Sequence, residues 1–163
     1  MKYLMSLLLL IVALYFHTLG IFYNNIWQYT QPFLLVLLLF YFNCQDVRIA
    51  YLLAFVAGLY LDSLSAIFGL YTFLFIFIIF ILRSLQLTWL TSKNIFTILS
   101  LAFLAYFIFW LAFWFLNFIF AWQIYFFSWS ILLQISKASL ISILILIFLH
   151  VFYYNVWLKK NER

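Results

Sequence analysis

The sequence predicts an all-α polytopic membrane protein, a bundle of six transmembrane helices with both termini in the cytoplasm. Two compositional observations carry this prediction: 71% of the 163 residues are hydrophobic, and 7% are charged. A soluble domain has about 45–50% apolar and about 25% charged residues, so this chain cannot cover a globule with polar side chains. The apolar runs are also continuous, whereas a transmembrane barrel alternates apolar and polar residues. Water-soluble enzymes, disordered tails and free nucleic-acid binders are thereby excluded.

The first apolar run, residues 3–22, is long enough to span a membrane as a helix. We expect it to be retained rather than cleaved as a signal peptide, because no A-x-A-like site follows it. A second helix is expected from Pro32, whose missing N–H costs nothing in a first turn, to about residue 42, or as far as Cys44. This segment is short for a hydrocarbon core of about 30 Å, so it either recruits residues from Ile26 onward or thins the bilayer.

A helical hairpin is expected next. Its first helix covers residues 49–61 and is interrupted at residues 62–65, and a tight turn lies near residues 65–69. Apolar residues then continue to Leu82, directly before Arg83. The turn is expected to be tight because no hydrophilic loop separates the two helices.

Two long helices are expected to complete the bundle. Residues 84–94 are mixed in polarity, and a fifth helix follows from residue 95 to about 122, long enough to tilt. After a short uncharged turn at 123–129, the sixth helix covers about 130 to 157. No repeat divides the chain, so residues 1–163 are expected to form a single integral membrane domain.

The distribution of Lys and Arg favours six spans over five, because cytoplasmic segments carry an excess of these residues. With six spans and a cytoplasmic N-terminus, the three outer turns carry neither Lys nor Arg, and Lys137 lies within the sixth helix. With five spans the basic tail would face outward. The seven residues placed on the cytoplasmic side are Lys2, Arg48, Arg83, Lys93, Lys159, Lys160 and Arg163.

Asp62 is the clearest candidate functional residue, because an Asp at mid-helix costs about 2.5–3.5 kcal/mol to insert. Three roles remain open from the sequence. Asp62 caps a helix after the interruption, with Ser63 and Ser65 helping; it pairs with Lys137, which is expected at a similar depth; or it faces a partner. Lys137 has the alternative of extending its amine to the outer membrane surface.

A stripe of small residues leads to this carboxylate. Ala50, Ala54, Gly58 and Asp62 are spaced four apart, and small residues at this spacing let another helix approach closely. Either the stripe packs internally against the fourth or sixth expected helix, or it is a docking face for the membrane helix of another protein.

Catalytic and metal-binding patterns are missing from the sequence. It contains no G-x-S-x-G, no H-E-x-x-H and no glycine-rich phosphate loop. Cys44 is the only cysteine, and His17 and His150 are expected at opposite depths, so no metal site and no cofactor are expected. No acidic or carbonyl-rich filter segment suggests an ion channel. The chain is therefore expected not to be an enzyme, and its net charge of +5 reflects membrane orientation rather than nucleic-acid binding.

Residues 58–71, GLYLDSLSAIFGLY, resemble the characteristic region of the rod shape-determining protein family MreD. That region has the form G-x-(L/I)-x-D-x-(L/I)-S-(small)-x-x-x-G before an apolar helix. Gly58, Asp62, Ser65 and Gly69 match it, and Ala66 stands where glycine is common. The apolar run after Pro32, the length and the basic tail are similar to the family as well.

The resemblance implies a non-enzymatic scaffold of the bacterial elongation complex, in the inner membrane, that maintains cell shape and lateral peptidoglycan synthesis. Its direct partner would be the single-span protein MreC, and through MreC it would meet MreB, RodA and the transpeptidase partner of RodA. The residues matched to the pattern, with Ala50 and Ala54, would then serve partner binding or structure.

The family is also similar in fold to the substrate-binding subunits of energy-coupling-factor vitamin transporters, which gives the alternative function. Those subunits carry an A-x-x-x-A contact in their first helix. Here residues 3–22 contain only Ala13, and the small stripe lies on the third expected helix, which favours the shape protein.

Overall fold

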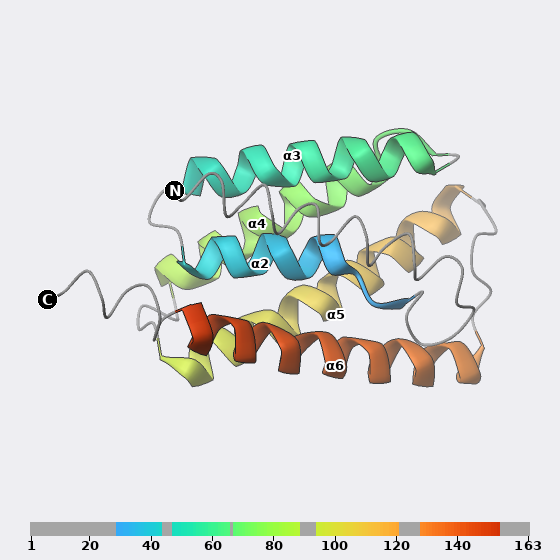
Figure 1. The fold of residues 1–163 in the computed structure, drawn as a ribbon. Coiled ribbons are helices and arrows are strands. Elements are labelled where there is room, and N and C mark those ends of the chain that lie inside the picture. The colour runs from blue at the N-terminus through green and yellow to red at the C-terminus, as the bar shows by residue number, and fades with distance from the viewer. Residues whose placement is uncertain (1–28, 44–46, 66, 89–93, 121–127, 154–163) are drawn as a thin grey trace, which may run out of the picture. The chain divides into compact units, whose positions relative to one another are not determined.

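The computed structural model describes residues 29–43, 47–65, 67–88, 94–120 and 128–153. Their regular structure is helical, and the expected all-α architecture is confirmed in this part of the chain (Figure 1). The helices are α2 (Pro32–Asn43), α3 (Val47–Leu64), α4 (Leu70–Thr88), α5 (Ile95–Phe120) and α6 (Trp129–Tyr153). All but α2 are long and apolar enough to cross a membrane. The first expected span, residues 3–22, lies outside the described residues.

The chain divides into two compact units. The hairpin unit is Asp46–Leu133 and contains α3, α4 and α5; the terminal unit is Met1–Gln45 with Gln134–Arg163 and contains α2 and most of α6. The single domain expected from the sequence stays a prediction.

In the hairpin unit, α3 buries one face. The buried positions recur every three to four residues, which is the spacing of one face of a helix. They are Ala50, Leu53, Ala54, Ala57, Gly58, Leu61 and Asp62. The opposite face exposes Leu52, Phe55 and Val56. Because these exposed side chains are all apolar, this face suits lipid rather than water.

The two helices of the hairpin lie side by side, with the turn at one end (Figure 1). Both helices are longer than predicted. α3 does not end at Leu61 but continues through Asp62 to Leu64, and α4 does not end at Leu82 but continues past Arg83 to Thr88. The sequence predicts helix ends at these polar residues, yet no glycine or proline stands at either place to stop a helix.

α5 (Ile95–Phe120) starts where predicted, and Asn94 accepts a hydrogen bond from the N–H of Ile95 through its side-chain Oδ1 at 2.8 Å. Its buried face is marked by Ala102, Ala105 and Phe109, which are fully buried. The other face carries a row of exposed apolar residues at helical spacing: Phe96, Leu99, Phe103, Phe107, Leu111, Phe115 and Phe118. A helix whose outer face is apolar over this length has the surface of a membrane span.

In the terminal unit, α2 starts at Pro32 as predicted and ends at Asn43, whose amide donates to the carbonyl of Leu39 at 2.7 Å. It is buried on nearly every side, as expected for a helix that is hydrophobic all round. α6 begins at Trp129, where Ser128 Oγ accepts from the N–H of Ile131 at 3.4 Å as a helix cap.

Candidate functional site at the turn between α3 and α4

The first turn of α4 lacks a cap of its own. Gly69 stands at the cap position, because its carbonyl accepts the first helical hydrogen bond, from Phe73 N at 3.0 Å. Its φ of +90° is a conformation that favours glycine, and glycine has no side-chain oxygen for the free N–H groups that follow. The missing acceptor must therefore come from elsewhere in the chain.

Asp62 supplies that acceptor from the last turn of α3. Its Oδ1 accepts from the N–H of Tyr71 at 2.8 Å, and its Oδ2 accepts from the N–H of Thr72 at 3.1 Å. The hydroxyl of Thr72 also donates to Oδ2 at 2.6 Å. One carboxylate thus caps α4 across the turn and ties the two helices together.

The setting explains why an acidic residue is used here. Asp62 is 2% exposed, and a buried carboxylate needs hydrogen-bond partners for both oxygens. The N-terminus of a helix offers free N–H groups and the positive end of the helix dipole. The N–H groups at the start of α4 bond the carboxylate and so offset the cost of burying it. Without the carboxylate, these N–H groups would lack acceptors.

Gly58, one helical turn before Asp62, sets the distance between the two helices. A Cβ placed on Gly58 would overlap the Cα of Thr72 and lie 2.7 Å from its backbone nitrogen. These are backbone atoms, so they cannot move aside as a side chain would. The glycine therefore allows the close approach that brings Asp62 within reach of α4.

Two serines satisfy the end of α3. Ser63 Oγ donates to the carbonyl of Tyr60 at 2.6 Å, and Ser65 Oγ lies within hydrogen-bonding distance of the carbonyls of Asp62 and Ile67, at 3.2 and 3.0 Å. The N–H of Ser65 donates to the carbonyl of Leu61 at 2.9 Å. The hydroxyls of both serines and the N–H of Ser65 are thus bonded within the chain.

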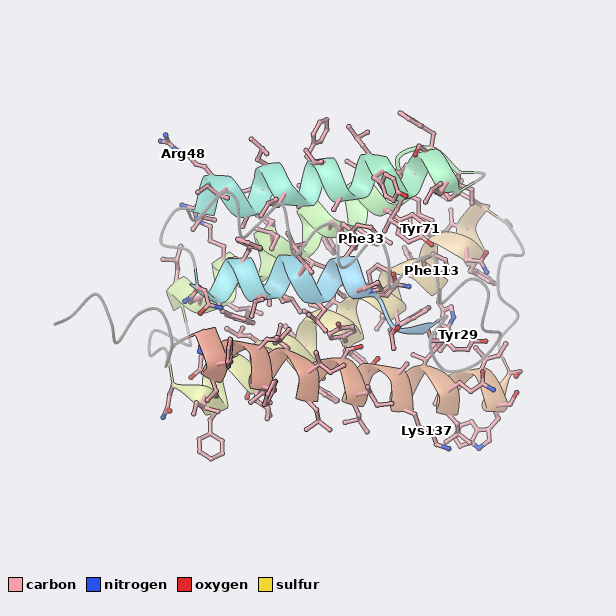
Figure 2. The ribbon with its side chains drawn as sticks, in the orientation of Figure 1. Tyr29, Phe33, Arg48, Tyr71, Phe113 and Lys137 are labelled. Carbon is pink, nitrogen blue, oxygen red and sulfur yellow. The ribbon has the colours of Figure 1, made fainter. Side chains whose placement is uncertain are left out.

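The same turn is coupled to α5 through aromatic rings. Tyr71, whose N–H is held by Asp62, has its ring centroid 6.5 Å from that of Phe109 and 6.1 Å from that of Phe113 (Figure 2). Phe75 also contacts Phe109, at 6.1 Å. Ring pairs at these separations attract one another beyond simple area burial. The aromatic cluster, defined as Tyr71, Phe75, Phe109, Trp110 and Phe113, joins α5 to α4.

The residues matched to the expected pattern meet at one place, each with a distinct structural contribution. Gly58 provides close approach, Asp62 the cap, Ser65 the end of α3, and Gly69 the turn conformation. Of the three roles left open for Asp62, the described geometry is that of a helix cap. The helix that Asp62 caps is α4. The interruption of α3 expected at Asp62 is wrong, because α3 continues through this residue to Leu64.

The small stripe is covered by the chain itself. Ala50 and Ala54 are buried, and Gly58 is packed against Thr72 of α4. A partner helix would have to displace these contacts to reach the stripe. Its predicted role as a docking face stays a prediction.

Lys137 belongs to the terminal unit and lies on the exposed face of α6 (Figure 2). Its pairing with Asp62 of the hairpin unit stays a prediction. Of the two histidines, His17 lies outside the described residues.

Thr72 is the member of this site that sequence reasoning missed. Its signal was present: a threonine at the third position of a helix whose cap residue is a glycine. A glycine cap has no side chain that could accept from the threonine hydroxyl. The hydroxyl can therefore donate to an acceptor on a neighbouring helix.

Comparisons with models of protein families, with curated proteins and with solved structures found no match for this chain.

Proposed function

We propose that this protein is a non-enzymatic membrane scaffold of the MreD type, in the inner membrane of a bacterium. In this role it binds MreC and, through MreC, meets MreB, RodA and the transpeptidase partner of RodA. The bundle has six spans with both termini in the cytoplasm, the first span being residues 3–22. It contributes to cell shape and lateral peptidoglycan synthesis by holding these partners in register.

The observation that carries the proposal is the convergence of Gly58, Asp62, Ser65 and Gly69 on the α3–α4 turn. These four positions lie within twelve residues of one another, and each has a structural role in the same turn: close approach, helix cap, end of α3 and turn conformation. Four apolar helices of spanning length are consistent with an integral membrane component.

The proposed mechanism depends on a hairpin with a defined shape. The carboxylate of Asp62 fixes the start of α4, and the aromatic cluster fixes α5 against α4. A partner helix that binds this unit meets a surface that loses little conformational entropy on binding, which favours association. Loss of the cap is expected to weaken assembly more than membrane insertion.

The test is purification of the tagged chain in a gentle detergent and measurement of the MreC that comes with it, using the wild type, Asp62→Ala and the control Ser63→Ala. Ser63 is an exposed neighbour whose hydroxyl donates to the carbonyl of Tyr60, within α3. We expect the wild type and Ser63→Ala to recover MreC equally, and Asp62→Ala to recover several-fold less at equal membrane content.

The competing outcome is equally concrete. If MreC and the wall synthases are absent, and a transmembrane coupling subunit with paired ATPases is recovered by mass spectrometry instead, the protein is a vitamin-capture subunit and the scaffold proposal fails. If Asp62→Ala keeps full binding to MreC and a rod shape, the scaffold stands but the assignment of the site is wrong.

A further inference from the structure

The α3–α4 hairpin is only just long enough to cross a membrane. α3 has 18 residues and rises about 27 Å at about 1.5 Å per residue. The hydrocarbon core of a bilayer is about 30 Å thick, and any tilt makes the height of a helix smaller still. Because a span needs about 17–25 residues, both helices are near the lower limit, and one end of the hairpin lies at or inside the edge of the core.

The arginines decide which end this is. Arg48, in the first turn of α3, is exposed at the end of the hairpin opposite Tyr71 (Figure 2). Arg83, exposed on the antiparallel helix α4, lies toward the same end. Arginine is held at the membrane surface because its charge is costly in hydrocarbon. Measured from Arg83, α4 rises only about 20 Å to its start at Leu70.

The surface of the turn is apolar. Phe68 is 83% exposed and Leu64 is 55% exposed, and residues 64–69 carry no charged side chain. A turn that projects into water is normally polar. Two large apolar side chains pointing outward from an uncharged turn fit lipid acyl chains.

The hydrogen bonds of the turn fit the same environment. In hydrocarbon no water is present to bond free backbone groups, so they must be bonded within the protein. The carboxylate of Asp62 takes two N–H groups at the start of α4, and Ser63 and Ser65 place their hydroxyls on backbone carbonyls. Asp62 thus supplies to these N–H groups the acceptors that water would supply at a helix end outside the membrane.

We propose that the turn between α3 and α4 lies within the hydrocarbon layer, below the headgroups of one leaflet, with Leu64 and Phe68 in contact with lipid acyl chains. The occupant of this apolar surface is the bilayer itself. The proposal concerns depth in the membrane and does not depend on any protein partner.

The test is site-directed spin labelling of the full chain in proteoliposomes of phosphatidylethanolamine and phosphatidylglycerol. Cys44, the only cysteine, is first replaced by serine. A label at Phe68→Cys is compared with labels at Phe77→Cys, an exposed position near the middle of α4, and at Leu87→Cys, an exposed position beyond Arg83. Relaxation by oxygen, which concentrates in hydrocarbon, is compared with relaxation by a water-soluble nickel chelate.

We expect the ratio of oxygen to nickel accessibility at Phe68→Cys to match that at Phe77→Cys and to exceed that at Leu87→Cys several-fold. A ratio equal to that at Leu87→Cys overturns the proposal, because the turn then lies in water. If Phe68→Cys does not fold, Leu64→Cys reports the same depth from the other side of the turn. Co-purification with MreC is unaffected by either result, so the two proposals fail separately.

Discussion

At the residue scale, Asp62 and Gly58 depend on each other. The carboxylate reaches Tyr71 and Thr72 only because the two helices approach closely at Gly58. The carboxylate in turn supplies the acceptors that the N–H groups of Tyr71 and Thr72 need at the start of α4. Each residue therefore needs the other, which explains their spacing of one helical turn.

Removing the carboxylate is expected to destabilise the protein. Asp62→Ala leaves three donors without their acceptor, and hydrogen bonds in membrane proteins contribute about 0.6 kcal/mol each on average, so we expect a loss of about 2 kcal/mol. Thr72→Val removes one of the three bonds and is expected to cost about a third as much. The free energy of unfolding in mixed micelles, titrated with dodecyl sulfate, measures both. Equal losses for the two variants would contradict a cap that serves three donors.

Adding a single methyl group at Gly58 is expected to separate α3 from α4. Gly58→Ala places a Cβ against backbone atoms of Thr72, and overpacking of this kind costs about 1–3 kcal/mol. The same titration measures the loss. Ala57→Gly, on the adjacent buried position, is the control for changing helix propensity at this point.

Gly69 contrasts with Gly58, because its constraint is conformational. A Cβ at Gly69 meets no atom within 4 Å, but its φ of +90° is unfavourable for any residue with a side chain. Gly69→Ala is therefore expected to cost about 1 kcal/mol, and Gly69→Asn less, since asparagine tolerates positive φ. If Ala and Asn are equally destabilising in the titration, steric crowding in the folded turn is the better explanation.

At the element scale, the aromatic cluster joins α4 and α5. Phe109 is fully buried and contacts the rings of Tyr71, Phe75, Trp110 and Phe113. Because lipid is as apolar as the protein interior, burial from water does not drive this packing. Shape and ring contacts hold the helices together.

Truncating the centre of the cluster is expected to loosen α5. Phe109→Ala is expected to cost about 1–3 kcal/mol, below the about 3–5 kcal/mol typical of water-soluble cores, because only the cavity and contact terms apply within a membrane. Phe107→Ala, two positions along on the exposed face, is the control and should change stability little. The unfolding titration again compares the two, and equal losses would show that the cluster adds nothing specific.

At the scale of the whole molecule, charge distribution predicts the orientation. Six spans with a cytoplasmic N-terminus place the basic tail in the cytoplasm. We expect green fluorescent protein fused after Arg163 to be fluorescent and alkaline phosphatase fused at the same point to be inactive. Active phosphatase at this position would exclude an even number of spans with a cytoplasmic N-terminus.

The link between Asp62 and Lys137 also belongs to this scale, since the two residues lie in different units. If they pair, neutralising both, Asp62→Asn with Lys137→Met, costs less stability than the sum of the single changes. Additive losses of stability in the unfolding titration would contradict the pairing of Asp62 with Lys137. The helix cap would then remain as the role of Asp62.

The sequence by itself determined the class of the protein and drew attention to Asp62. Continuous apolar runs are unmistakable in hydropathy, and a carboxylate within them stands out because its insertion is costly. The hairpin with its turn at residues 65–69 was also foreseeable, since Gly69 and the small polar residues mark it. The helix ends predicted at Asp62 and Arg83 are wrong, because a polar side chain alone does not stop a helix.

Only the tertiary structure decided which acceptor serves which helix, and which of the many aromatic residues face inward. Phe109 is buried and Phe107 is 59% exposed, although both are phenylalanines in the same apolar run. In a membrane the interior and the surroundings of a helix are both apolar, so hydrophobic periodicity does not separate them. Likewise, Thr72 joins Asp62 only when α3 and α4 fold together, because local spacing does not reveal a cap that reaches across a turn.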